Sequence, residues 1–247
     1  MNAGFFTQRG RTYKVPHDRI GTRWVLIAHQ AITRAFDIMR QEGFVLQPAS
    51  EVDITVKLEN VLNNEVLNRG EVDGFDKIFF GKVRRVEVVN HDGTKKSKRP
   101  DLCFELRRED RVDWDQLQDA LFAECKPVDR DHSLNGHYCA VEKDCTGIER
   151  FVIGDYAWAM EEALMIGYVR DGFAILPDLA NALTDPDRRA KLGEPTAPTP
   201  VDARPNRQPR NALYKTTHKR SFRWRGGKKA TPIDIFHSWH DCDRQSG

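Results

Sequence analysis

The sequence of 247 residues has no apolar run long enough to cross a bilayer, and its start, MNAGFFTQRGRTYKV, lacks the apolar core of a signal peptide. These two absences argue against the transmembrane and secreted classes. We therefore expect a soluble, cytoplasmic protein with no membrane partner. Because 39% of the residues are hydrophobic, the chain can build one full core, or one core plus an appendage.

Paired cysteines are also absent. The five cysteines are scattered, and no two of them form a C-x-x-C motif, which argues against a disulfide framework and against a four-cysteine zinc site. We expect reduced thiols at Cys103, Cys125, Cys139, Cys145 and Cys242.

Acidic residues are missing from one long stretch near the C-terminus. Residues 204–229 include ten basic residues and no acid, with Tyr214, Phe222 and Trp224 interleaved. Strand alternation would place Arg220 on the face of these aromatic residues. A basic stripe with an apolar reverse side is typical of a sheet edge that follows a phosphate backbone, and the alternative is a solvated face balanced by acids elsewhere. The candidate nucleic-acid ligands are Lys219, Arg220, Arg223, Arg225, Lys228 and Lys229.

Hydrophobic periodicity predicts two helices in the first third of the chain. The first covers residues 22–43, with Thr22 as its N-cap. The second covers residues 49–70 and opens on an approximate capping box of Ser50 and Asp53.

The middle of the chain is richer in strand signals. β-branched and aromatic residues predict a strand or hairpin over 75–93, and strands over 101–108, 120–128 and 172–178. Apolar residues at helical spacing predict a third helix over 147–172. This order of elements predicts an α/β fold, with a mixed central sheet flanked by helices.

The C-terminal part has a different composition. The proline-rich segment 194–209 is expected to form an extended linker or arm, and residues 212–224 and 232–239 to form a hairpin or a late pair of sheet strands. His218 and His237 fall on the tryptophan-bearing faces of these strands, so packed or hydrogen-bonded histidines are expected there. The alternative is a zinc site made of His237, His240 and Cys242.

The segment LFAECKPVD, residues 121–129, places charge on a strand that otherwise reads as buried. Glu124 and Lys126 share one face of it, and Asp101 opens the preceding strand. If the two strands are neighbours, Asp101 and Glu124 can converge on one Mg²⁺ or Mn²⁺ ion, which keeps waters and takes a phosphate oxygen. Such an ion would offset the cost of burying two carboxylates. The alternative is a cross-strand ion pair on a half-exposed face.

The residues RPD at 99–101, followed by Glu-Cys-Lys at 124–126, resemble the signature of the PD-(D/E)xK nuclease superfamily. The order of elements over residues 50–178 is also similar to the core of that superfamily, the restriction-endonuclease-like fold. The specific part of the resemblance is confined to the acidic and lysine positions.

The resemblance implies a role for each of these positions. Asp101 and Glu124 would hold the metal ion together with the backbone carbonyl of Cys125, and Lys126 would be the catalytic lysine. Some members of the superfamily add an acid from the helix before the sheet, and Glu51 is the candidate here. A carboxylate placed there because the helix N-terminus favours it is the alternative.

At the level of the whole chain, the resemblance implies a Mg²⁺-dependent endonuclease that hydrolyses DNA in restriction, phage defence, mobile-element or repair processing. The nuclease-like domain would cover residues 1–193, with a helical extension at 1–48, followed by the linker at 194–211 and a basic strand pair at 212–247. The alternatives are a non-cleaving module that binds nucleic acid or a partner, and a nuclease acting on RNA or a nucleotide. A homodimer and a partner subunit are both left open.

Overall fold

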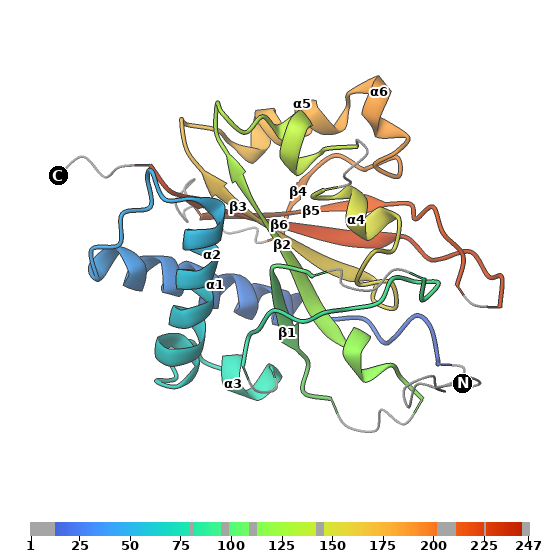
Figure 1. Ribbon diagram of the computed structural model, residues 1–247, viewed down its shortest axis with the longest axis horizontal. Helices are drawn as coiled ribbons and strands as arrows, with labels where there is room; N and C mark the ends of the chain where they lie inside the picture. The colour runs from blue at the N-terminus through green and yellow to red at the C-terminus, as the bar shows by residue number, and fades with distance from the viewer. Residues whose placement is uncertain are drawn as a thin grey trace, which may run out of the picture.

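The centre of the molecule is a mixed sheet in the strand order β1-β2-β3-β6-β5-β4 (Figure 1). The computed structural model describes residues 13–79, 82–94, 99–108, 113–141, 146–201, 211–224 and 226–243. β2, β3 and β6 run parallel to one another, whereas β1, β5 and β4 pair antiparallel with their neighbours. The strand bounds are β1 Leu102–Glu105, β2 Ala120–Val128, β3 Glu162–Val169, β4 Thr199–Pro200, β5 Asn211–His218 and β6 Ile233–Asp241.

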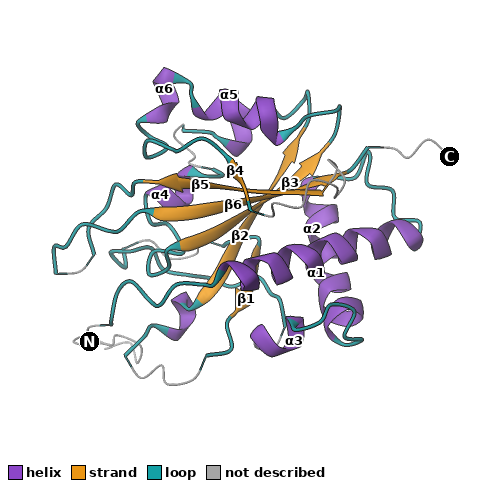
Figure 2. Cartoon of the chain, turned by 180° about the vertical axis from the view of Figure 1, so that it is seen from behind, coloured by secondary structure: helices purple, strands orange, loops and turns teal. Residues whose placement is uncertain are grey.

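Helices cover both faces of this sheet, as Figures 1 and 2 show. One side carries α1 (Thr22–Gln41), α2 (Glu51–Val61) with its π-helical continuation η1 (Leu62–Leu67), and α3 (Phe75–Ile78). The other side carries α4 (Glu149–Val152), α5 (Ala180–Leu183) and α6 (Pro186–Arg189). Short helical turns connect the elements: η2 (Gln116–Gln118), η3 (Leu134–Tyr138) and η4 (Ile175–Leu179). The predicted α/β fold with a mixed, helix-flanked sheet is therefore confirmed.

Both N-terminal helices form where the sequence predicts them, with one difference in capping. Gly21, not Thr22, is the N-cap of α1, because Thr22 already has helical geometry and Gly21 is extended. Ser50 caps α2 as predicted, since its Oγ accepts a hydrogen bond from the backbone N of Asp53 at 3.1 Å. Among the described helices, none combines the length and the apolar character needed to cross a membrane.

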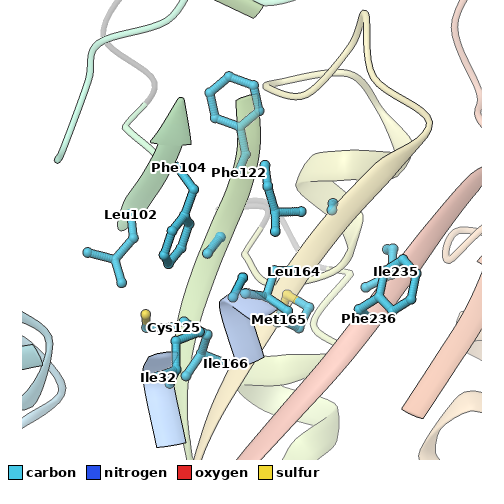
Figure 3. Packing of buried hydrophobic residues seen from close by; sticks show 14 of the residues in the cluster. Ile32, Leu102, Phe104, Phe122, Cys125, Leu164, Met165, Ile166, Ile235 and Phe236 are labelled. Carbon is cyan, nitrogen blue, oxygen red and sulfur yellow. The ribbon is translucent and has the colours of Figure 1, made fainter. Parts of the chain in front are cut away.

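The core lies between α1 and the central strands. Every residue of β2 and of β3 is buried, because each strand has a parallel neighbour and a helical layer on both faces. Figure 3 shows Ile32 of α1 beside Cys125 of β2 and Ile166 of β3. A polar side chain on β2 therefore needs partners inside the protein.

The helix predicted over 147–172 is wrong. Only its first turn is helical, as α4, and its second half is the strand β3. Gly154 (φ +75°) and Ala157 (φ +53°) have left-handed backbone conformations that end the helix. Because β3 is apolar on both faces, its side chains satisfy helical spacing as well as strand spacing, and periodicity could not separate the two.

Two predicted strands are also wrong. Over 75–93 the described residues form α3 and then isolated bridges, since the adjacent β1 is only four residues long and offers few partners. Over 172–178 the chain turns at Gly172 (φ +74°) and enters the helical turn η4. The carboxylate of Asp178 accepts a hydrogen bond from the backbone N of Ala174 at 2.7 Å, which stabilises that turn.

The predicted late pair of strands forms as β5 and β6, and β6 lies in the middle of the sheet between β3 and β5. Residues from the C-terminal part therefore belong to the central sheet. The proline-rich segment runs along β5, where Thr199 and Pro200 of β4 pair with Lys215 and Tyr214. Residues 202–210 of this segment lie outside the described residues.

The buried histidines form a hydrogen-bonded chain. His218 Nδ1 lies 2.7 Å from the carbonyl of Leu192, and Thr216 Oγ1 lies 2.7 Å from His218 Nε2 and 2.8 Å from His237 Nε2. His237 Nδ1 lies 2.9 Å from the hydroxyl of Tyr138. Burial lowers the pKa of His218 to about 4 and lowers the pKa of His237, so both rings are neutral at pH 7.

The hydrogen bonds in this series can be donated in one direction only. A carbonyl only accepts, so His218 donates from Nδ1 and accepts from the Thr216 hydroxyl at Nε2. Thr216 has no second proton and must accept from His237 Nε2, which leaves His237 Nδ1 to accept from Tyr138. The expected histidine pair is confirmed as hydrogen-bonded. The zinc alternative is not supported, because His240 lies against Phe36 of α1 and does not converge with His237.

We predict that Thr216→Val destabilises the protein by about 2–3 kcal/mol, because two buried histidine nitrogens lose their partner. Urea denaturation measures the change. In the wild-type protein, ¹⁵N chemical shifts should report a proton on Nδ1 of His218 and on Nε2 of His237. The opposite pair of tautomers, or a Thr216→Val protein as stable as wild type, would contradict the assignment.

Candidate functional site

Asp101, the residue directly before β1, lies close to Glu124 of β2. β1 and β2 pair antiparallel with Leu102 opposite Ala123, so the next position in the same register sets Asp101 against Glu124. Asp101 Oδ2 also accepts a hydrogen bond from the backbone N of Cys125 at 2.7 Å. Glu124 is 1% exposed. The two carboxylates that the sequence singled out are therefore brought together, with Glu124 buried and Asp101 partly buried.

Lys126 lies one pleat further along the same face of β2. Its Nζ is 3.2 Å from Oε1 of Glu124 and 2.9 Å from Oε1 of Glu51, the first residue of α2. The last residue of β2 that pairs with β1 is Ala123, so Lys126 belongs to the part of β2 that extends past β1. There its side chain can reach the N-terminus of α2.

Two further side chains reach Glu124, and the sequence analysis missed both. Arg150 of α4 places Nη1 3.6 Å from Glu124 Oε1, and the hydroxyl of Tyr156 donates a hydrogen bond to Glu124 Oε2. Both residues fall in the segment that was predicted as one helix. The break at Gly154 was the available signal, because a glycine followed by Asp155 in an apolar stretch is typical of a turn.

The cluster contains three carboxylates and two cations, and its electrostatics follow from burial. Burial, together with the nearby Glu124 carboxylate, raises the pKa of Asp101 to about 7. Desolvation works to lower the pKa of Lys126, but the Glu124, Glu51 and Asp101 carboxylates outweigh it and raise the pKa. The Glu124 carboxylate likewise raises the pKa of Arg150 against its desolvation. Lys126 and Arg150 are therefore cations at pH 7, while Asp101 exchanges a proton near that pH.

The donor set fits a hydrated Mg²⁺ ion better than a metal held by protein alone. Among the described residues, no group of three or more His, Cys, Asp or Glu side chains is arranged to hold a metal. Mg²⁺, however, is commonly bound by one or two carboxylates plus waters and substrate phosphates, and Asp101 and Glu124 supply two. The N–H of Cys125 points toward Asp101. The N–H and the carbonyl of a strand residue point to the same side, so the Cys125 carbonyl also faces the side of Asp101. Glu51 is engaged by Lys126, so it positions the lysine.

The predicted basic residues divide into two kinds. Lys219, Arg223, Lys228 and Lys229 are exposed, as a nucleic-acid ligand must be. The prediction for Arg220 is wrong, because its side chain is 2% exposed and donates to the carbonyls of Ala157, Trp158 and Thr231. Arg225 lies outside the described residues.

Comparisons of this chain with protein-family models, with curated proteins and with solved structures found no match. The geometry of the Asp101, Glu124 and Lys126 cluster and of its neighbours is therefore what bears on function.

Proposed function

We propose that this chain is a metal-dependent nuclease that hydrolyses phosphodiester bonds of DNA. The observation that carries the proposal is the placement of Asp101 opposite Glu124, with the ammonium of Lys126 3.2 Å from the Glu124 carboxylate. The two carboxylates and the ammonium provide ligands for a divalent ion and a cation for the scissile phosphate. We extend the proposal to membership of the PD-(D/E)xK superfamily, acting in the cytoplasm in restriction, phage defence, mobile-element or repair processing.

In this proposal each residue has a distinct task. A divalent ion held by Asp101 and Glu124 would supply a bound water of lowered pKa and neutralise charge on the phosphate. Lys126 is already protonated, so it offsets negative charge on the phosphate and does not accept a proton from water. Arg150, 22% exposed at its side chain, can contact a phosphate oxygen from α4. Tyr156 orients Glu124 through its hydroxyl.

One observation favours the alternative of a non-cleaving binding module. The Glu124 carboxylate already has Lys126, Arg150 and Tyr156 as partners, so the apo cluster is a satisfied ion-pair network. A binding module would keep these ion pairs and this hydrogen bond intact. A nuclease must instead let a divalent ion displace Lys126 from Glu124, and this difference can be measured.

The proposal is tested with plasmid DNA and Mg²⁺, with EDTA as the blank. Asp101→Asn is expected to lower the cleavage rate by about 10³-fold or more, equivalent to ~4 kcal/mol of lost transition-state stabilisation. The matched control is Asp73→Asn, which makes the same chemical change at a side chain that is 97% exposed, and it should cleave like wild type. Mg²⁺-dependent cleavage that survives Asp101→Asn would refute the assignment, and no cleavage by wild type would favour the binding module.

A further inference from the structure

The loop between β5 and β6, residues 219–232 and here called the basic loop, carries cations without nearby acids. In the described part of the chain, no carboxylate lies within 4.0 Å of a charged nitrogen of Lys219, Arg223, Lys228 or Lys229. Several cations elsewhere on the surface do have such partners, including Lys57 with Glu42, Arg69 with Glu65, Lys77 with Asp73, Arg84 with Glu105 and Arg99 with Glu87. The basic loop is thus a local excess of positive charge on a chain whose formal net charge is only +2.

The described residues of the basic loop, 219–224 and 226–232, are held in place by several contacts. Phe222, Trp224 and Ala230 form a small buried cluster separate from the main core, against which Trp158 packs. The backbone N of Trp224 donates to the carbonyl of Lys228 at 3.0 Å, and its indole Nε1 donates to the carbonyl of Trp158 at 3.1 Å. Cations presented by such an anchored loop lose less conformational entropy on binding than cations on a flexible tail.

The basic loop is attached to the segment that carries Arg150 and Tyr156. Arg220 donates to the carbonyls of Ala157 at 3.2 Å and Trp158 at 3.0 Å, and the backbone N of Ser221 donates to the carbonyl of Val152 at 3.1 Å. In Figure 1 the loop is the orange-red segment at the right of the molecule, beyond α4.

The basic loop packs closely against the segment at Gly154. A Cβ added at Gly154 would lie 2.7 Å from the ring of Phe222, which is closer than side chains tolerate. The loop and the 150–158 segment are therefore packed against each other, and the loop carries the exposed cations while the segment carries the site residues Arg150 and Tyr156.

We infer that the basic loop binds the phosphodiester backbone of nucleic acid through Lys219, Arg223, Lys228 and Lys229, and that Arg220 is a positioning residue that joins this surface to the candidate site. Exposed lysine and arginine side chains that lack an acidic partner bind phosphates and release counterions, with no need for a metal ion. The choice of nucleic acid over an anionic membrane or an acidic protein rests on the proposed function. The hydrogen bonds and packing that connect the loop to the segment of Arg150 and Tyr156 would place a bound backbone near the site.

The test uses the full chain and a dye-labelled 30-base-pair DNA duplex in EDTA, so that no cleavage occurs. Fluorescence anisotropy between 50 and 200 mM NaCl gives the affinity and its salt dependence. The triple variant Arg223→Gln, Lys228→Gln, Lys229→Gln is expected to bind at least about tenfold more weakly at 50 mM salt. The slope of log K against log salt should fall in magnitude by about 2–3, because three phosphate contacts are lost. The matched control is Lys57→Gln, Arg69→Gln, Lys77→Gln, which removes three acid-paired cations from the helical side of α2 and α3 and should change the affinity less than twofold.

Each result supports or overturns the inference. Equal weakening by both triple variants would show that only net charge matters, and an unchanged affinity in the first would remove the loop from the interface. Vesicles of phosphatidylserine that bind wild type more tightly than the duplex, and lose binding in the first variant, would assign the loop to membranes. Failure of the proposed function is distinguishable. In that case duplex binding in EDTA still depends on the loop, while Mg²⁺ produces no cleavage.

Discussion

Asp101→Asn is expected to be more stable than the wild-type protein at pH 8 without metal, by up to about 4 kcal/mol. The reason is the buried carboxylate of Asp101, whose pKa is raised from 3.8 to about 7 by burial and by the neighbouring Glu124 carboxylate. Above pH 7 the wild-type protein must hold this charge next to Glu124. Asparagine keeps an oxygen that can accept from the Cys125 N–H and carries no charge.

The sign of the pH dependence follows from linkage. Between pH 3.8 and about 7 the folded protein keeps a proton on Asp101 that the unfolded chain has lost. The stability contributed by the protonated group is therefore complete below pH 3.8 and is lost as the pH rises through 7. Urea denaturation in EDTA at pH 5 and pH 8 should show a fall in wild-type stability that is smaller in Asp101→Asn by about 2–3 kcal/mol, the part of the contribution that is lost above pH 5.

A divalent ion should narrow this difference in stability. Metal binding requires the ionised carboxylate, so millimolar Mg²⁺ or Mn²⁺ at pH 8 should stabilise the wild-type protein and leave Asp101→Asn unchanged. The apparent metal affinity should weaken as the pH falls below about 7, because a proton then competes for Asp101. Asp73→Asn is the control and should behave like wild type in every condition. A wild-type protein that is equally stable at pH 5 and pH 8, with or without metal, would contradict the proposed environment of Asp101.

The parts of the fold and site that sequence reasoning predicted share a physical cause. The strand over 120–128 was predicted correctly. The charged pair Glu124 and Lys126 stands out on this strand because burial of charge is costly. Asp101 was singled out because it opens the preceding strand after Arg99 and Pro100, and the antiparallel register continued by one position sets it against Glu124. Local rules such as the Ser50 cap were also reliable, because they involve residues three positions apart.

The parts that could not be predicted depend on contacts between distant segments. Whether EALMIGYV becomes a helix or a strand is decided by the parallel neighbours β2 and β6, not by its own spacing. Tyr156 and Arg150 become members of the site only because Gly154 and Ala157 turn the chain back toward Glu124. The assignment of Arg220 failed for the same reason, since its carbonyl partners at 157–158 are about sixty positions away in the chain.

Arg220 provides the second prediction with a large effect. Arg220→Ala is expected to destabilise the protein by about 3–5 kcal/mol. The variant removes the donor from the carbonyls of Ala157, Trp158 and Thr231. It also empties the space beside the rings of Phe222 and Trp224, over which the guanidinium lies at 5.3 and 5.8 Å from the centroids. Ala157 would then keep its left-handed conformation without the bond that stabilises it.

Thermal and urea denaturation measure this loss, and the control is Arg223→Ala, three positions along at an exposed site, for which we expect a change within 0.5 kcal/mol. The two arginine variants should differ in which property they change first, stability or duplex binding. Arg223→Ala weakens duplex binding in EDTA and spares stability, whereas Arg220→Ala lowers stability and, at a temperature where it is still folded, weakens binding because the basic loop is no longer held. Arg220→Lys should recover little, since one ammonium cannot replace a planar fork that reaches three carbonyls. An Arg220→Ala protein with wild-type stability and weakened binding would instead make Arg220 a direct ligand of the phosphate backbone, and the connection between the basic loop and the segment of Tyr156 would have to be abandoned.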